Sequence, residues 1–242
     1  MAVLEAVGLT VRFGGVVAVS GVDLAVESGR VMGLIGPNGA GKTTLFNVLC
    51  GLQQPDPGRI LLRGQDVTSR SPSTRAALGL ARTFQRLELF DVLTCRENVL
   101  VAVEAKGSAF RSPGGEEVVD RVLERVGLLD VADVRADELP TGQARLLEVA
   151  RALATEPEVL LLDEPAAGLN SRETDELAIL IRSLADEGLA VVLVEHDISM
   201  VMKVCDEIVV LDAGRVISHG PAAVVRNDPA VIAAYFGSAG GS

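Results

Sequence analysis

The chain alternates between short, continuous apolar runs and longer segments in which apolar residues recur every three or four positions. A continuous apolar run of this length is typical of a strand that is buried on both faces of a parallel sheet. Three runs fit this description: residues 159–162, 190–194 and 208–211. Apolar residues at positions 177, 180, 181 and 184 follow a helical period, and we expect Ser171 to cap this helix.

The first part of the chain has a different pattern. Residues 3–35 predict short strands joined by turns, with Ser20-Gly21 separating residues 16–19 from residues 22–26. A strong turn at residues 55–58 precedes another short strand at residues 59–62. These pieces predict a small antiparallel sheet packed on an α/β core.

The middle of the chain is mostly helical in pattern. Apolar residues at positions 146, 149, 150 and 153 form one helical stripe, whereas residues 106–115 are polar and predict a surface loop. We therefore predict one domain over residues 1–242. Its core comprises residues 1–86 and 155–237, a helical subdomain is inserted at residues 87–154, residues 221–236 form short helices, and residues 238–242 form a flexible tail.

Composition narrows the class of protein. The chain has 242 residues, 48% of them hydrophobic, and a formal net charge of −11, which argues against nucleic acid as the main partner. Its apolar runs are too short to span a bilayer, and its first residues lack a basic leader or a signal-peptide core. Three cysteines without paired spacing suit a reducing compartment, and the two histidines form no zinc-ligand cluster with them. We expect a cytoplasmic protein that meets membranes only through a partner.

The stretch most informative about function lies between a predicted strand at residues 31–35 and a predicted helix. It fits the pattern Gly-x-x-x-x-Gly-Lys-Ser/Thr, with the residues Gly36, Pro37, Asn38, Gly39, Ala40, Gly41, Lys42 and Thr43. Small residues let the backbone curl so that several N–H groups point at one cluster of phosphate oxygens, beside the positive end of the next helix. Lys42 can reach the β and γ phosphates, and the Thr43 hydroxyl can ligate Mg²⁺. We include the adjacent Thr44 in this predicted nucleotide site, in preference to a glycine-rich turn with a solvated lysine.

Two carboxylates end the first of the buried runs. Asp163 emerges at the carboxyl end of a predicted parallel strand, where it can hold Mg²⁺ directly or through water. Glu164 follows it and can polarise an attacking water. A strand that exits into an acidic turn is weak evidence by itself, but together with the phosphate loop it predicts a nucleotide-hydrolysing site.

These motifs resemble those of the nucleotide-binding subunits of ATP-binding cassette transporters, over about residues 3–237. The resemblance implies an α/β fold with a P-loop NTPase core around a parallel sheet, an antiparallel β subdomain and an inserted helical subdomain. It implies ATP as the nucleotide, Phe13 stacked on adenine, Gln85 as a ligand of Mg²⁺ beside the attacking water, and His196 at the γ phosphate. The family signature corresponds to Leu139-Pro140-Thr141-Gly142-Gln143, and Gly168-Leu169-Asn170 corresponds to the loop at the dimer contact.

Two positions depart from the family pattern. Pro140 replaces the signature serine and has neither its hydroxyl nor an N–H, although proline fits the first turn of the following helix. Losing one charge-assisted hydrogen bond costs about 1.5–3 kcal/mol, so we expect an altered but functional signature, suited to the weaker site of an asymmetric pair. Thr141 offers a replacement hydroxyl. Asn170 stands where many relatives carry Asp, and it keeps an acceptor oxygen while losing a charge.

The resemblance also implies partners. A head-to-tail dimer with an identical or sister ATPase subunit encloses two ATP molecules, and its closing and opening move membrane permease subunits. Residues 87–92 are a candidate permease contact, with ordinary packing as the alternative. Residues 82–85, 168–170 and 233–237 are similar to the importers of branched-chain amino acids and related amides, which work with an extracytoplasmic solute-binding protein. The expected location is peripheral, at the cytoplasmic face of the cell membrane.

Two other classes of protein remain open at this point. One is a soluble ATPase of the same family that serves iron–sulfur cluster assembly. The other is a nucleotide-binding module that Pro140 has made unable to hydrolyse ATP. Lys42, Gln85 and Glu164 are all present, and this speaks against the second alternative.

Overall fold

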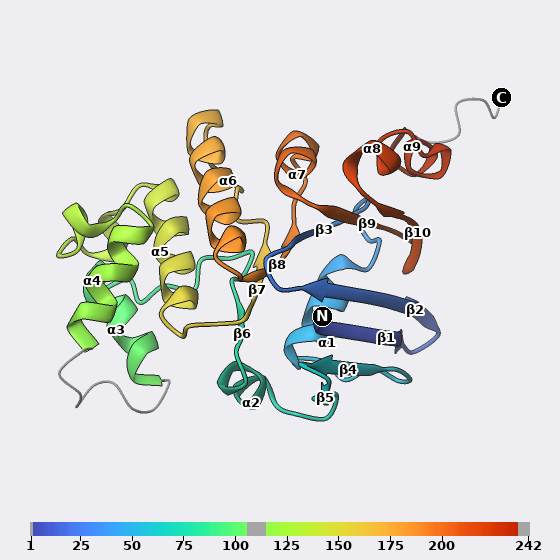
Figure 1. Ribbon diagram of the computed structural model, residues 1–242, viewed down its shortest axis with the longest axis horizontal. Helices are drawn as coiled ribbons and strands as arrows, with labels where there is room; N and C mark the ends of the chain where they lie inside the picture. Colours follow the sequence, from blue (N-terminus) through green and yellow to red (C-terminus); the bar gives the residue numbers. More distant parts are fainter. Residues whose placement is uncertain (1, 106–114, 237–242) are drawn as a thin grey trace.

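The computed structural model describes residues 2–105 and 115–236. At the centre of the described part lies a six-stranded sheet with the order β10-β9-β3-β8-β7-β6 (Figure 1). Its strands are β3 (Val31–Ile35), β6 (Leu80–Arg82), β7 (Val159–Asp163), β8 (Ala190–Val194), β9 (Glu207–Asp212) and β10 (Arg215–Gly220). Neighbouring strands pair in parallel except β10, which runs antiparallel to β9. The three apolar runs of the sequence form β7, β8 and β9, as predicted.

Both faces of the central sheet are covered at β7 and β8, which explains why these two strands are buried along their whole length. Along β8, Ala190, Val192 and Val194 belong to one hydrophobic cluster, whereas Val191 and Leu193 belong to another. Successive side chains of a strand point to opposite faces, so each face of β8 contributes to a separate core. The sheet is therefore packed on both sides, and this packing fixes the position of its carboxyl edge.

A second, antiparallel sheet has the order β2-β1-β4-β5 in the described residues. Its strands are β1 (Ala2–Phe13), β2 (Val16–Glu27), β4 (Arg59–Leu62) and β5 (Gln65–Asp66). The small antiparallel sheet was predicted, but a break at Ser20-Gly21 was wrong, because β2 continues through both residues. They lie between the pairs Leu9–Val22 and Val11–Val19 and form a bulge opposite Thr10, whose Oγ1 accepts the Gly21 N–H at 2.9 Å.

Helix α1 (Lys42–Cys50) lies between the two sheets, and the short helix α2 (Pro72–Ala77) follows β5. Leu45, Phe46, Val48 and Leu49 of α1 are fully buried in the cluster that also contains residues of both sheets. The phosphate-loop segment leads directly into α1. Its position is therefore fixed by packing on two sides.

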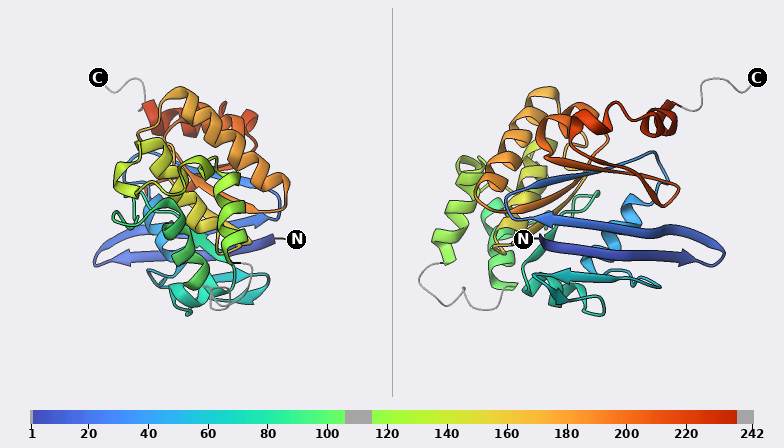
Figure 2. Two further views of the ribbon diagram at one scale, coloured as in Figure 1. Left: turned by 90° about the vertical axis from the view of Figure 1, so that its left-hand side faces the viewer. Right: turned by 45° about the vertical axis from the view of Figure 1, so that its right-hand side comes forward.

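Three helices gather at one end of the molecule, at the left of Figure 1: α3 (Cys95–Ala105), α4 (Gly115–Arg125) and α5 (Thr141–Leu153). Short 3₁₀ turns at Leu129–Val131 and Ala136–Glu138 join α4 to α5. Figure 2 shows that the long β1–β2 pair extends away from this helical end. Gly115, predicted as part of a loop, is the first residue of α4, while the rest of that loop and the predicted tail at residues 238–242 lie outside the described residues.

The remaining helices are α6 (Ser171–Asp186), α7 (Ile198–Val204), α8 (Ala222–Val225) and α9 (Pro229–Phe236). The predicted cap of α6 was wrong by one residue. Asn170 caps this helix through a reciprocal pair of bonds with Glu173, and its side chain accepts the N–H groups of Arg172 and Glu173. Among the described residues, no helix combines the length and the apolar character that crossing a bilayer requires.

Helix α9 packs close to the start of the phosphate loop. Its residue Val231 shares a buried cluster with Ile35, the last residue of β3. Burial raises the pKa of the Tyr235 phenol, and a hydrogen bond with the Gly36 backbone opposes this shift. The phenol therefore lies beside the first glycine of the loop.

Candidate functional site

Four adjacent strands bring chemically active residues to one edge of the central sheet. Strands β3, β8, β7 and β6 are parallel neighbours in that order, so their carboxyl ends lie side by side. The phosphate loop, residues 36–43, follows β3, and Gln85 follows β6. Asp163 ends β7 with Glu164 directly after it, and His196 follows β8. Residues that are far apart in the sequence thus converge at one edge.

The phosphate loop depends on glycine at two positions. A Cβ atom on Gly36 would lie 2.0 Å from the Leu211 carbonyl oxygen, and one on Gly41 would lie 2.4 Å from that of Ala18. The φ angles of the two glycines, 150° and 103°, are ones that other residues rarely adopt. Helix α1 begins at Lys42, directly after Gly41, so its first unpaired N–H groups lie at the loop.

The side chain of Lys42 is hydrogen-bonded to the backbone of the phosphate loop. Its Nζ donates hydrogen bonds to the carbonyl oxygens of Gly36 at 2.7 Å and Pro37 at 3.0 Å. Burial lowers the pKa of Lys42, and the negative charges of Glu164 and Asp163 oppose this shift. The ammonium is therefore within electrostatic reach of both carboxylates.

The side chain of Glu164 contacts two other predicted site residues. Gln85 Nε2 donates to Glu164 Oε2 at 3.0 Å, and His196 Nε2 lies 2.9 Å from Oε1. Each carboxylate oxygen thus has its own side-chain partner, which orients the group. Glu164 has a φ of 51°, a left-handed conformation that is uncommon for a residue with a side chain and often occurs at functional sites. The structure brings Gln85, Glu164 and His196 together, and their roles in hydrolysis stay predictions.

Asp163 has a partner that sequence reasoning missed. Arg82 Nη2 lies 2.7 Å from Asp163 Oδ2, and both side chains are almost fully buried. The Arg82 guanidinium also lies 5.0 Å from the ring centre of Phe84 and 5.6 Å from that of Phe46, where cation–π attraction supports it. A charged residue at the end of an apolar strand was the available signal in the sequence.

Glu195 was also missed, although it stands next to the predicted histidine. It is 5% exposed, and its carboxylate accepts the N–H groups of Ala166 at 2.7 Å and His196 at 3.0 Å. Burial raises the pKa of Glu195, and these backbone hydrogen bonds oppose the shift. Glu195 thereby ties the segment after Glu164 to the segment that carries His196.

The signature residues lie at the start of α5. Pro140 is the N-cap residue, one position before the first turn in which it was expected, and Thr141 is the first helical residue. A Cβ on Gly142 would lie 2.6 Å from Glu173 Oε1, and a Cβ on Gly168 would lie 3.3 Å from the Thr141 methyl group. The segment from Leu139 to Gln143 therefore packs against α6 and the predicted dimer-contact loop. Among the described residues it makes no hydrogen bond with the phosphate loop.

Phe13 stands at the end of β1 with 51% of its surface exposed. Its partner across the sheet is Val16, close to Ala18, whose carbonyl oxygen faces Gly41 of the phosphate loop. Phe13 therefore belongs to the strand pair that flanks the loop. Its exposed ring suits the stacking role that the resemblance implies, and that role stays a prediction.

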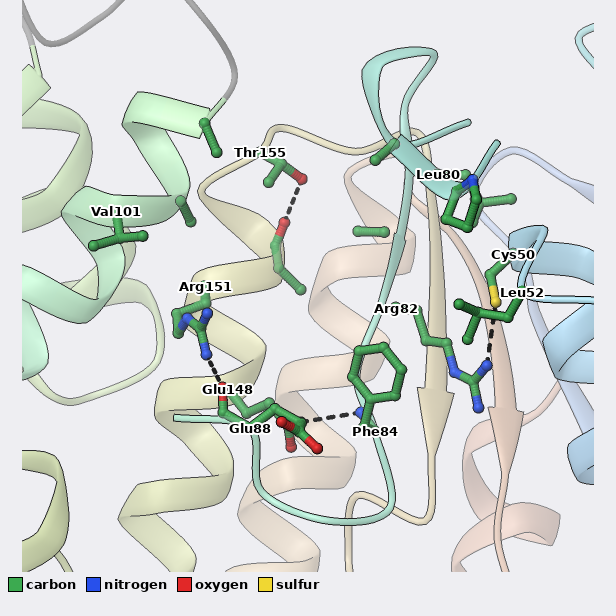
Figure 3. A pocket seen from close by; sticks show the side chains of 16 residues that line it. Cys50, Leu52, Leu80, Arg82, Phe84, Glu88, Val101, Glu148, Arg151 and Thr155 are labelled. Carbon is green, nitrogen blue, oxygen red and sulfur yellow. Dashed lines mark hydrogen bonds between the residues drawn. The ribbon is translucent and has the colours of Figure 1, made fainter. Parts of the chain in front are cut away.

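A groove of about 360 Å³ separates the helical end from the core (Figure 3). Its lining includes Arg82, Phe84, Glu88, Glu148 and Arg151. Figure 3 shows Arg151 directed toward Glu88, whose carbonyl oxygen accepts a hydrogen bond from Arg151 Nη1. The predicted permease contact begins at this groove. Three of its apolar side chains are substantially exposed: Leu87, Phe90 and Val92.

Comparisons with known proteins match nearly the whole chain. A family model described as ABC transporter matches residues 19–167, and one described as branched-chain amino acid ATP-binding cassette transporter matches residues 215–240. The chain belongs to the ATP-binding cassette transporter family. The fold class, the family and the ATPase class predicted from the sequence are thereby confirmed.

The similar proteins include transport ATP-binding proteins from bacteria. The chain is 45% identical over 251 residues to the high-affinity branched-chain amino acid transport ATP-binding protein BraF of Pseudomonas aeruginosa, and the match covers 98% of each chain. It is 43% identical over 247 residues to the corresponding protein LivG of Escherichia coli K12, covering 96% of each. A solved structure of the ADP conformation of MJ1267, an ATP-binding cassette of an ABC transporter, has a TM-score of 0.88. It is 31% identical and covers 98% of this chain and 100% of that chain.

Proposed function

We propose that this chain hydrolyses ATP to power the import of branched-chain amino acids or related amides through a membrane permease. The observation that carries the proposal is the grouping at the sheet edge. Glu164 is held by Gln85 and His196, within electrostatic reach of the phosphate-loop ammonium of Lys42. The similarity to BraF and LivG supports the choice of cargo.

The residues of the loop suit a triphosphate. The N–H groups of residues 36–43 and the start of α1 offer donors to the phosphate oxygens, and we assign this role to the whole loop and to Thr44. Lys42 exchanges its two carbonyl acceptors for the β and γ phosphates. Because these interactions need only local donors, the negative net charge of the chain does not prevent nucleotide binding.

The donor set also suits Mg²⁺, which prefers oxygen ligands. We assign the Thr43 hydroxyl, the Gln85 amide oxygen and Asp163 Oδ1 to the ion, since Arg82 occupies Asp163 Oδ2. No group of three acidic, His or Cys side chains that could hold a metal occurs in the described residues, so the remaining ligands would come from phosphate and water. Bound Mg²⁺ supplies positive charge that neutralises the phosphate oxygens.

Hydrolysis requires a water oriented at the γ phosphorus, and we assign that task to Glu164. Glu164 accepts a proton from the water as the water oxygen bonds to phosphorus, and the electron pair of the broken P–O bond leaves with ADP. Gln85 and His196 hold the two oxygens of the carboxylate in a fixed orientation. His196 lies half-exposed beside Glu164, and we assign to it the contact with the γ phosphate.

The second half of each site is assigned to another ATPase subunit in a head-to-tail dimer. The first N–H groups of α5, at Thr141, Gly142 and Gln143, lack partners within the helix and are free to meet a γ phosphate across the interface. Leu139 positions this turn, and Pro140 supplies no donor. Phe13 stacks on the adenine held by its own subunit.

We assign permease binding to the groove of Figure 3 and to the exposed apolar residues beside it. A permease segment seated there would contact both the core and the helical end. The chain would then lie at the cytoplasmic face of the membrane as a peripheral subunit. An extracytoplasmic solute-binding protein would deliver the cargo to the permease, so the ATPase subunit has no need of a cargo pocket.

Turnover of purified chain tests the ATPase assignment. Lys42→Ala removes the ammonium that faces the phosphates, and we expect ATP hydrolysis to fall by about a hundredfold or more. A matched control is Lys203→Ala, since Lys203 pairs with Asp175 on the surface and should be dispensable for turnover. Equal turnover in Lys42→Ala and the wild type would refute the assigned site.

Cargo is tested by uptake. In cells that lack this chain but retain its permease, radiolabelled leucine uptake should be lost and should return with the wild-type gene. The gene for the Lys42→Ala variant should not restore leucine uptake. Unchanged leucine uptake without the chain, combined with loss of uptake of another solute, would contradict the proposed cargo while leaving the ATPase assignment intact.

A further inference from the structure

The segment Arg82 to Gln85 is bound to strand β7 through its first two residues and to helix α5 through its last two. Its first two residues are bound to β7: Arg82 pairs with Asp163, and the Thr83 N–H donates to the Leu161 carbonyl oxygen at 2.9 Å. The Asp163 N–H in turn donates to Thr83 Oγ1 at 3.2 Å. The start of the segment is therefore fixed to the core of the molecule.

The next two residues are bound to α5 instead. Phe84 N–H donates to Glu148 Oε1 at 3.0 Å (Figure 3). Arg145 donates to the Phe84 carbonyl oxygen at 3.3 Å and to the Gln85 carbonyl oxygen at 2.8 Å. Arg145 and Glu148 also pair with each other at 3.4 Å. We call Arg145 and Glu148 the α5 clamp.

The α5 clamp is buried at an energetic cost. The side chains of Arg145 and Glu148 are 9% and 7% exposed, and burial raises the pKa of Glu148 against the hydrogen bond from Phe84 and the charge of Arg145. Apolar residues would fill such a position without desolvating two charges. What the charged pair adds is a set of directional bonds to the backbone of only two residues, Phe84 and Gln85.

Gln85 is thus held from two sides. Its carbonyl oxygen is bound to Arg145 on α5, while its side chain reaches back to Glu164 after β7 at 3.0 Å. We propose that Arg145 and Glu148 are positioning residues for ATP hydrolysis, because they make the placement of Gln85 at Glu164 depend on the placement of α5. This inference rests on the proposed role of Glu164 in hydrolysis.

The α5 clamp should affect the rate of hydrolysis and leave the affinity for ATP unchanged. Neither of its residues belongs to the phosphate loop, so ATP affinity should not depend on it. The orientation of the reacting groups should depend on it, and a misplacement of about 1 Å at an active site can cost roughly a hundredfold in rate. Loss of the clamp should therefore lower kcat and leave the dissociation constant of ATP nearly unchanged.

A double-mutant cycle with Gln85 tests the inference. Single-turnover release of phosphate and equilibrium binding of a fluorescent ATP analogue are measured for full-length chains. Glu148→Ala should lower kcat by about tenfold or more and change the ATP dissociation constant by less than about twofold. In a Gln85→Ala background, Glu148→Ala should lower kcat by less than about twofold further, because the residue through which it acts is gone.

Val149→Ala is the matched control for general damage to α5. Val149 is 1% exposed in the apolar cluster on the same helix, and its truncation leaves a cavity. Any loss that it causes should be the same with and without Gln85. Equal losses for Glu148→Ala in the two backgrounds would overturn the inference, because the pair would then act only through stability.

Conservative variants keep the inference testable if Glu148→Ala folds poorly. Glu148→Gln retains an oxygen for the Phe84 N–H and should recover part of kcat. Arg145→Lys can satisfy only part of the two-carbonyl contact and should lie between Arg145→Ala and the wild type. If neither variant recovers any kcat, that result contradicts a positioning role for the α5 clamp. If the wild-type chain itself hydrolyses no ATP, the proposed function is refuted instead.

Discussion

Among single residues, two neighbouring carboxylates have different surroundings. Glu164 meets the side chains of Gln85 and His196, whereas Glu195 is buried and accepts backbone N–H groups. Burial raises the pKa of Glu195, so the folded chain holds this proton to higher pH than the unfolded chain does. The unfolding free energy should therefore decrease as pH rises from the ordinary value of 4.5 through the raised pKa.

Glu195→Gln should weaken this pH dependence, since it removes the titrating group and keeps one acceptor oxygen. Urea unfolding at a series of pH values above 4.5 measures it. A residual slope is expected, because the pKa of Glu148 is raised by burial as well. The exposed Glu176 provides the control, and Glu176→Gln should keep the wild-type slope. Identical slopes for Glu195→Gln and the wild type would contradict the prediction.

At the residue level, the sequence points to a candidate residue where a motif marks its position. Gln85 and His196 were located because they fall at motif positions, and the structure places both at Glu164. Arg82 and Glu195 were missed because their significance lies in burial and in partners from other strands. The one local signal, a charged residue at the end of an apolar strand, applies to Arg82 and does not identify its partner.

At the scale of elements, apolar runs located β3, β7, β8 and β9 of the central sheet, because a strand buried on both faces shows no alternation of polar and apolar residues. The edge strands β6 and β10 were not predicted, since β6 has only three residues and β10 is largely polar. The edges of elements were harder to predict. The bulge at Ser20-Gly21 depends on the partner strand β1, so the sequence of β2 alone reads as a turn. Likewise, Asn170 and Ser171 are both good capping residues, and only the backbone conformation selects Asn170.

This choice of cap can be measured. Asn170→Ala removes the acceptor for two N–H groups at the start of α6 and should lower the unfolding free energy by about 1 kcal/mol. Ser171→Ala is the adjacent control and should change it by less than about 0.5 kcal/mol, as at other surface positions. Chemical denaturation of both variants gives the comparison. A larger loss from Ser171→Ala than from Asn170→Ala would restore the original capping prediction.

At the scale of the whole molecule, the candidate residues at the sheet edge and the signature turn lie on different elements of the fold. The described contacts tie the signature to α6 and to Gly168, and none of its hydrogen bonds reaches the phosphate loop. This separation is compatible with the proposed head-to-tail dimer, in which a second subunit supplies the signature turn. That dimer remains a prediction, and the sequence leads to it only through family resemblance.

Glu164→Gln should trap the dimer. Without the proposed proton acceptor, ATP stays intact, and the closed form should accumulate as a species of twice the monomer mass. Size-exclusion chromatography with light scattering, in the presence of Mg-ATP, measures it. The double variant Lys42→Ala with Glu164→Gln should remain monomeric. A monomeric Glu164→Gln variant with normal turnover would argue against both the base and the dimer.

The position of helix α9 has a spectroscopic consequence. Tyr235 is the chain's one tyrosine, and the chain has no tryptophan, so near-ultraviolet emission comes almost entirely from one phenol. That phenol lies beside Gly36, where the phosphate loop begins. The protein thus carries its own fluorophore beside the first residue of the phosphate loop. Changes in tyrosine emission during titration with a non-absorbing triphosphate would report events at that loop without any attached label.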